Sequence, residues 1–179
     1  MNFRKVLENI IEFFDRKKIR FAVIGAFGLQ AYGLSRMTRD VDFVAEKSFR
    51  DDILSFLESL GYKTLYVSSG YSNHIHGKEE MGRLDFVYVE GKTAELLFSG
   101  SRIKLFSKNL LIPVPKPEHI AAMKIFAMKN DPSREYHEMA DLQFLLSLPG
   151  IDWEEIKGYF EQYGMTEKYE ELERKIKKS

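Results

Sequence analysis

Three aspartates are the residues whose types and spacing could do chemistry. Asp40 and Asp42 are separated only by Val41, and residues two apart in a strand point to the same face. Two carboxylates held side by side repel each other unless a cation lies between them. Oxygen ligands of this kind suit Mg²⁺. The pair therefore predicts a divalent-metal site, and the alternative is an exposed strand end with two solvated aspartates near Arg36 and Arg39.

A third aspartate, Asp85, lies in a second strand expected over residues 83–90. In this stretch Leu84, Phe86 and Tyr88 alternate with Asp85, Val87 and Val89. Asp85 is thus an ionisable group on a face that otherwise carries valines, where an isolated half-buried carboxylate is unfavourable. A metal or a cationic partner resolves this, and the alternative to a metal is a salt bridge to Arg83 or Arg102.

The stretch before the aspartate pair has features of a phosphate-binding turn. Residues 21–24 are an apolar run typical of a buried strand, and Gly25, Ala26 and Gly28 follow at once. Small residues let the backbone turn sharply and let a phosphate approach the first amides of the next helix. We expect that helix to end near Gly33.

Together these residues resemble the nucleotidyltransferases with a polymerase-β-like fold, whose signature is a glycine turn, an Asp-x-Asp/Glu pair on a strand and a third carboxylate on a later strand. Gly25-Ala26 stands at the turn, Asp40 and Asp42 form the pair, and Asp85 matches the third carboxylate. The longer pattern Gly-Leu-Gln-Ala-Tyr-Gly…Arg-x-Thr-x-Asp-Val-Asp is similar to that of the small bacterial AbiEii toxin-like nucleotidyltransferases.

The resemblance implies an α/β (α+β) fold with a mixed sheet flanked by helices. It implies that Asp40, Asp42 and Asp85 bind one or two Mg²⁺ ions, and that Gly25, Ala26 and Arg39 hold the phosphates of a nucleoside triphosphate. Ala26 departs from the family pattern, because a second Gly or a Ser is usual there and a hydroxyl contact to phosphate is absent. Backbone amides can still serve.

Pro113, Pro115 and Pro117 mark a boundary in the chain. We expect a nucleotidyltransferase core over residues 1–115 and a C-terminal helical region, residues 116–179, that packs on the core. The apolar spacing predicts helices over residues 3–17, 49–60, 151–163 and 165–177. Ser48 and Ser133 are expected to cap helices, as is Asp152.

Lys124 lies in the apolar pattern of the helix that follows Pro117. A lysine there can extend its ammonium to water. The resemblance implies instead that Lys124 reaches the triphosphate and neutralises charge on the leaving pyrophosphate. His137-Glu138 stands where the family has Lys-Asp, and the supporting role for Glu138 and Asp141 is to orient Arg134 or Lys124 by ion pairing.

The resemblance implies transfer of a nucleotidyl group to an acceptor hydroxyl of an RNA, a protein or a small molecule, with a cognate antitoxin as a candidate partner. One alternative is a catalytically silent member that binds a nucleotide or a partner protein, a reading that Ala26 and His137 favour. Another is an antibiotic-modifying transferase, which shares the same metal chemistry.

Composition sets the remaining bounds. The 179 residues carry 27 basic and 27 acidic side chains and no cysteine, so neither a polyanion-attracting net charge nor thiol chemistry is expected. No signal peptide or membrane span is visible in the sequence, and a cytoplasmic location without membrane partners is the expectation. His74 and His76 are expected to share the open face of a sheet as polar residues, without a third metal ligand.

Overall fold

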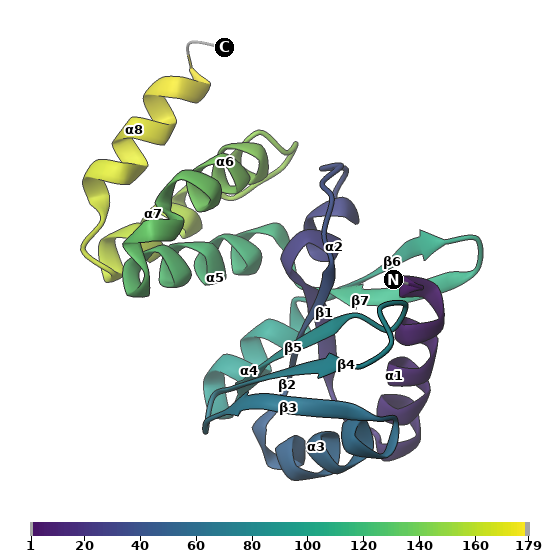
Figure 1. Ribbon diagram of the computed structural model, residues 1–179. Coiled ribbons are helices and arrows are strands. Elements are labelled where there is room, and N and C mark those ends of the chain that lie inside the picture. The colour runs from purple at the N-terminus through teal and green to yellow at the C-terminus, as the bar shows by residue number, and fades with distance from the viewer. Residues whose placement is uncertain (1, 178–179) are drawn as a thin grey trace. The chain divides into compact units, whose positions relative to one another are not determined.

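The computed structural model describes residues 2–177, and the chain divides into two compact units, residues 1–115 and residues 116–179 (Figure 1). The helices of the first unit are α1 (Phe3–Lys17), α2 (Gly25–Gln30), α3 (Arg50–Ser59) and α4 (Gly91–Ser99). Its strands are β1 (Phe21–Ile24), β2 (Asp40–Glu46), β3 (Tyr62–Val67), β4 (Tyr71–His76), β5 (Arg83–Val89), β6 (Arg102–Ser107) and β7 (Leu110–Val114). The expected mixed α/β fold is confirmed.

The five-stranded sheet of the first unit has the order β1-β2-β5-β4-β3. Strands β2 and β5 at its centre are parallel, and the other pairs are antiparallel. One row of register partners runs across four strands, through Ile24, Asp42, Asp85 and Asn73. Strands β6 and β7 form a separate hairpin, so Pro113 in β7 interrupts no central ladder.

One face of the sheet is a core of aromatic residues. Phe43 of β2 stacks on Phe86 of β5 with ring centroids 5.0 Å apart, and Phe14 of α1 meets both rings edge-on. Phe13 of α1 in turn stacks on Phe56 of α3 at 3.9 Å. Helices α1 and α3 thus cover the face to which alternate residues of β2 and β5 point, which leaves the aspartates on the opposite face.

Three expectations about local structure are wrong. Ser48 does not cap a helix, because a 3₁₀ turn over Lys47–Phe49 precedes α3. Ser133 is itself capped, since its amide donates to the carboxylate of Asp131 at the start of a second 3₁₀ turn. His74 is not on an open sheet face: it is fully buried on the core face, between Thr64 and Ser72.

The second unit is helical, with α5 (Pro117–Asn130), α6 (Glu135–Leu146), α7 (Trp153–Gln162) and α8 (Thr166–Ile176). Pro117 occupies the first turn of α5, where a missing amide hydrogen leaves no bond unmade. Asp152 caps α7 by accepting from the amide of Glu155, as expected. Residues 178 and 179 of the expected C-terminal region lie outside the described residues. No helix among residues 2–177 is long and apolar enough to cross a membrane.

Candidate active site

Four charged side chains share the face of β2 and β5 that lies opposite the aromatic core, and we call them the aspartate face: Asp40, Asp42, Arg83 and Asp85. The parallel register places Asp40 opposite Arg83 and Asp42 opposite Asp85. Register partners on neighbouring strands point to the same side of a sheet, as do residues two apart on one strand. The register therefore brings the three aspartates of the sequence prediction to one face, with a guanidinium among them.

Gly25 lies directly against Asp42. Its φ of +60° is a left-handed conformation that favours glycine. A Cβ atom at Gly25 would be 2.0 Å from Asp42 Oδ2 and 2.9 Å from Asp42 Cβ, so no side chain fits there. Helix α2 begins at this residue without a side-chain cap, and the phosphate-binding turn expected from the sequence thus adjoins the aspartate face.

Asp85 is the most enclosed of the three aspartates, with 8% of its surface exposed. Arg83 Nε donates to Asp85 Oδ1 at 3.0 Å, and this bond is the main cause that raises the pKa of Arg83. Burial raises the pKa of Tyr71, and the negative charge of Asp85 raises it further. Asp85 is therefore held by a cation of its own strand, Arg83, and lies near a phenol of the neighbouring strand β4, Tyr71.

The remaining candidates of the first unit lie around this group. Asp40 accepts a hydrogen bond of 2.6 Å from the hydroxyl of Thr38, in the loop before β2. Arg39 is exposed beside it, and Ala26 is buried in α2. The loop is fastened to α2 because the side-chain amide of Gln30 donates to the carbonyl of Arg36.

The donors of the aspartate face are of the type that Mg²⁺ takes, namely carboxylate oxygens, and the buried Asn73 Oδ1 beside Asp85 has no hydrogen-bond partner. Among residues 2–177, however, no three His, Asp or Glu side chains are placed as a ready group of metal ligands. The residues fit a divalent cation by chemistry, provided that Asp85 exchanges its partner.

Lys124 lies in the second unit, within a buried ion-pair network. Its Nζ is 2.6 Å from Asp141 Oδ2 and 2.9 Å from Glu138 Oε2, and Arg134 pairs with the other oxygen of Glu138 at 2.6 Å. Lys124 is only 9% exposed, so its ammonium does not extend to water as one interpretation expected. Glu138 and Asp141 were expected to form ion pairs with Lys124 or Arg134. The structure shows these ion pairs.

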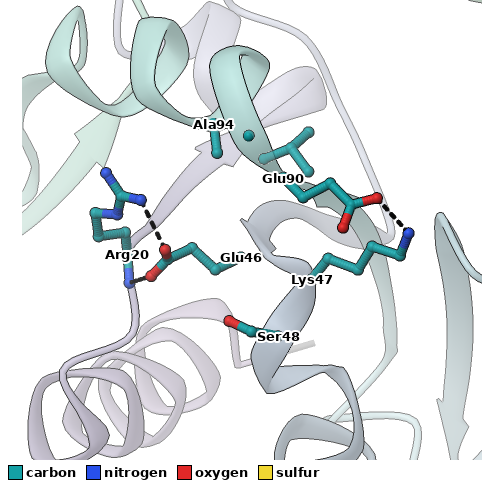
Figure 2. A pocket seen from close by; sticks show the side chains of 8 residues that line it. Arg20, Glu46, Lys47, Ser48, Glu90 and Ala94 are labelled. Carbon is teal, nitrogen blue, oxygen red and sulfur yellow. Dashed lines mark hydrogen bonds and ion pairs between the residues drawn. The ribbon is translucent and has the colours of Figure 1, made fainter.

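A pocket of about 400 Å³ opens at the carboxyl ends of β2 and β5, away from Asp40 at the start of β2. Figure 2 shows its charged side chains turned toward each other: Arg20 bonds Glu46, and Lys47 bonds Glu90. Arg20 also pairs with Glu95. Because the cations are matched by carboxylates, this pocket offers no excess of positive charge to a triphosphate.

Sequence reasoning missed Tyr71 and Asn73 as neighbours of Asp85. Both are on β4, and only the register Asn73 to Asp85 brings them there. The available signal was the alternation of Tyr71, Asn73 and Ile75 against Ser72, His74 and His76, which separates the aspartate side of β4 from its core side.

Comparisons with known proteins identify the family and the fold. Residues 11–178 match the family model for the nucleotidyl transferase AbiEii toxin of a type IV toxin–antitoxin system. No curated protein matches the chain. Among solved structures, the solution structure of the antibiotic-resistance factor ANT(2'')-Ia has a TM-score of 0.71 at 13% identity, with all of both chains covered.

Two further structures share the fold. An antigenic nucleotidyltransferase-like protein from Paracoccidioides brasiliensis has a TM-score of 0.61 at 14% identity, with 98% of this chain and 92% of that chain covered. The lincosamide antibiotic adenylyltransferase LnuA, solved with lincomycin bound, has a TM-score of 0.54 at 19% identity, with 80% and 96% covered. At these identities the likeness is one of fold.

Proposed function

The chain belongs to the AbiEii family of nucleotidyl transferases, and on that premise we propose that it moves a nucleotidyl group from a nucleoside triphosphate to an acceptor hydroxyl with the help of Mg²⁺. The observation that carries this proposal is the β2–β5 register. It sets Asp42 beside Asp85, with Asp40 one step along the same face. Gly25 and the start of α2 adjoin that face, where the phosphates are expected.

Asp40, Asp42 and Asp85 would hold the cation. A bound Mg²⁺ supplies charge neutralisation for the entering and leaving oxygens. The acceptor oxygen attacks the α-phosphorus, the bond to the β-phosphate oxygen breaks, and pyrophosphate leaves. Asp85 is suited to receive the proton of the acceptor hydroxyl, because it adjoins Asp42 and is shielded from water.

The phosphates would bind at the turn between β1 and α2. The absence of a side-chain cap on α2 leaves the first amides of Gly25 and Ala26 to donate, and exposed Arg39 adds positive charge. The role of Lys124 at the leaving pyrophosphate stays a prediction from the resemblance. In this structure its ammonium is engaged by two carboxylates.

We propose a toxin role from the family, with a cognate antitoxin as partner and the cytoplasm, where nucleoside triphosphates are supplied, as the location. The acceptor is an RNA, a protein or a small molecule. The alternative is a silent member that binds a nucleotide without turning it over. Ala26 at the turn and the Arg83–Asp85 pair are the observations that favour this alternative.

Turnover of single nucleotides tests the proposal. The purified protein is incubated with each labelled nucleoside triphosphate, with Mg²⁺ and with a cell extract, and transfer of label and release of pyrophosphate are measured. We expect Asp42→Asn to abolish both, while Asp15→Asn, the same change at an exposed position of α1, leaves them intact. Calorimetry that finds nucleotide binding without pyrophosphate release would establish the silent alternative instead.

A further inference from the structure

Arg83 stands inside the aspartate face. The register sets it opposite Asp40, and its own strand places it two residues before Asp85, so it shares their side of the sheet. The aspartate face therefore contains three carboxylates and one guanidinium. The guanidinium is bonded to the carboxylate that is most shielded from water, through Nε at 3.0 Å.

We propose that Arg83 is a resident counter-ion of the aspartate face: it holds Asp85 in the metal-free enzyme and releases it when a divalent cation binds. Arg83 would thereby set the affinity of the site for the cation. This inference rests on the proposed function, since it concerns the same carboxylates, but it assigns to Arg83 a role that the Asp-x-Asp pattern does not contain.

Burial explains why Asp85 needs such a partner. A carboxylate that is 8% exposed loses most of its hydration, and a buried charge without a partner is strongly unfavourable. Arg83 removes that penalty as long as no metal is present. Asn73 is the register partner of Asp85 on β4, and its Oδ1 is buried without a hydrogen-bond partner, whereas the charge of Asp85 acts on the phenol of Tyr71.

The exposure of Arg83 explains how a cation could replace it as the partner of Asp85. The side chain of Arg83 is 41% exposed, against 11% for Asp85, so the guanidinium can turn into water while the carboxylate stays in place. A divalent cation held by Asp40, Asp42 and Asp85 would interact with several carboxylates, whereas Arg83 Nε is bonded to one. We therefore expect the cation to displace Arg83 from Asp85. The free energy of cation binding is reduced by the cost of breaking the Arg83–Asp85 ion pair.

Tyr71 offers a direct probe of this exchange. It lies on β4 two residues before Asn73, on the aspartate side of the sheet, and the charge of Asp85 acts on its phenol. Tb³⁺ binds the oxygen ligands that divalent cations use and emits when a nearby tyrosine transfers energy to it. Titration of Tb³⁺ with excitation of tyrosine reports binding at Asp85 without any turnover, and Mg²⁺ competition then gives the affinity for Mg²⁺.

We expect Arg83→Gln to bind Tb³⁺ and Mg²⁺ roughly tenfold more tightly than the wild type, because no charge-assisted hydrogen bond has to be broken. Arg83→Lys keeps the charge and should fall between the two. Arg102→Gln, the same change at an exposed position of the β6–β7 hairpin, should match the wild type. Tyr71→Phe should dim the emission without weakening Mg²⁺ competition.

Equal or weaker cation binding by Arg83→Gln would overturn the proposal. If that variant does not fold, the wild-type protein can still test the proposal by NMR of ¹⁵N-labelled arginine. The Arg83 Nε–H signal is assigned by its loss in Arg83→Lys. This signal should shift, and its proton should exchange faster with water, as Mg²⁺ is added. A signal unchanged at saturating Mg²⁺ would also overturn it. Failure of the proposed function would give a different result in the titration, because the wild type would then bind neither Tb³⁺ nor Mg²⁺ at Asp42 and Asp85.

Discussion

Carboxylates and cations lie together in two regions of this molecule, in different proportions. The aspartate face of the first unit has three carboxylates and Arg83, and it opens toward solvent through Asp40 and Arg83. The network of the second unit has Lys124 and Arg134 against Glu138 and Asp141, and its two carboxylates and Lys124 are buried. Among these named residues, carboxylates outnumber cations in the first region, and the two kinds of charge are equal in number in the second.

This difference suggests different roles for the two regions, namely ligand binding for the aspartate face and structural support for the Lys124 network. In the buried network, opposite charges pair with each other, and the Lys124–Asp141 pair joins helix α5 to helix α6. An unbalanced group repels itself and becomes stable when a cation joins it. From the same residue types we therefore expect structural support in the second unit and propose cation binding in the first.

The largest effect should come from the balanced network. Lys124→Met leaves Glu138 and Asp141 buried without their shared cation, and we expect a loss of about 3–5 kcal/mol in the free energy of unfolding. Urea unfolding followed by circular dichroism measures it, with Lys129→Met, an exposed lysine of the same helix, as the control. A loss of turnover without a loss of stability would instead make Lys124 a group that acts on the nucleotide.

The core face of the sheet supplies a third arrangement, which is polar but uncharged. His74 is bonded to Thr64 and Ser72, and Ser72 to Tyr88, all without a carboxylate. Burial lowers the pKa of His74 to about 4 from 6.5. Between pH 4 and pH 6.5, the unfolded chain therefore binds a proton at His74 that the folded chain does not bind. The free energy of unfolding consequently falls as the pH drops from 6.5 toward 4.

From 1.36 kcal/mol per pKa unit, this loss is on the order of 3 kcal/mol. Urea midpoints between pH 7 and pH 4 measure it, and His74→Gln should flatten that part of the curve. If the slope between pH 6.5 and pH 4 were the same with and without the imidazole, His74 would not be its source.

A smaller effect is expected at the turn. Gly25→Ala places a methyl group against Asp42 and a side chain at φ +60°, so we expect a loss of about 1–2 kcal/mol in stability from the backbone alone. Turnover should fall much further, because the Asp42 carboxylate has to move. Gly33→Ala, at another left-handed position but with open space around it, separates backbone strain from the displacement of Asp42. Equal turnover by the two variants would contradict the contact argument.

The smallest effect, and one of opposite sign, is expected at Asp40. Asp40→Asn removes one of the mutually repelling charges while an amide oxygen can still accept from Thr38. In the absence of divalent metal we expect the free energy of unfolding to rise by up to about 1 kcal/mol. Asp141→Asn is the matched change in the balanced network and should be destabilising. Thermal unfolding of both variants checks whether the two regions respond in opposite directions.

Much of this comparison could be predicted from local pattern. Helix α1, strand β2 and strand β5 follow the apolar periodicity of the sequence, and the three aspartates were found from the two-residue repeat and the alternation around Asp85. These elements could be predicted because a repeat of 3.6 residues for a helix, or of two residues for a strand, is visible within a short segment. For Asp85 the sequence left open a metal or a salt bridge to Arg83 or Arg102, and the structure shows the salt bridge to Arg83.

What sequence could not provide is pairing between strands. His74 and His76 alternate as a half-exposed strand would, yet β4 lies beside β5, so His74 points into the aromatic core near Phe86. Tyr71 and Asn73 become neighbours of Asp85 for the same reason. The Lys124 network likewise depends on how α5 meets α6, which no spacing within either helix determines.

The row through Ile24, Asp42, Asp85 and Asn73 has a consequence for how the protein can vary. Hydrogen bonds at the centre of a sheet open only when the whole domain opens, whereas loops and chain ends open on their own. We therefore expect the backbone around Asp42 and Asp85 to exchange more slowly than the loops. The segments around that row can then vary in length and sequence while the spacing of Asp42 and Asp85 stays the same.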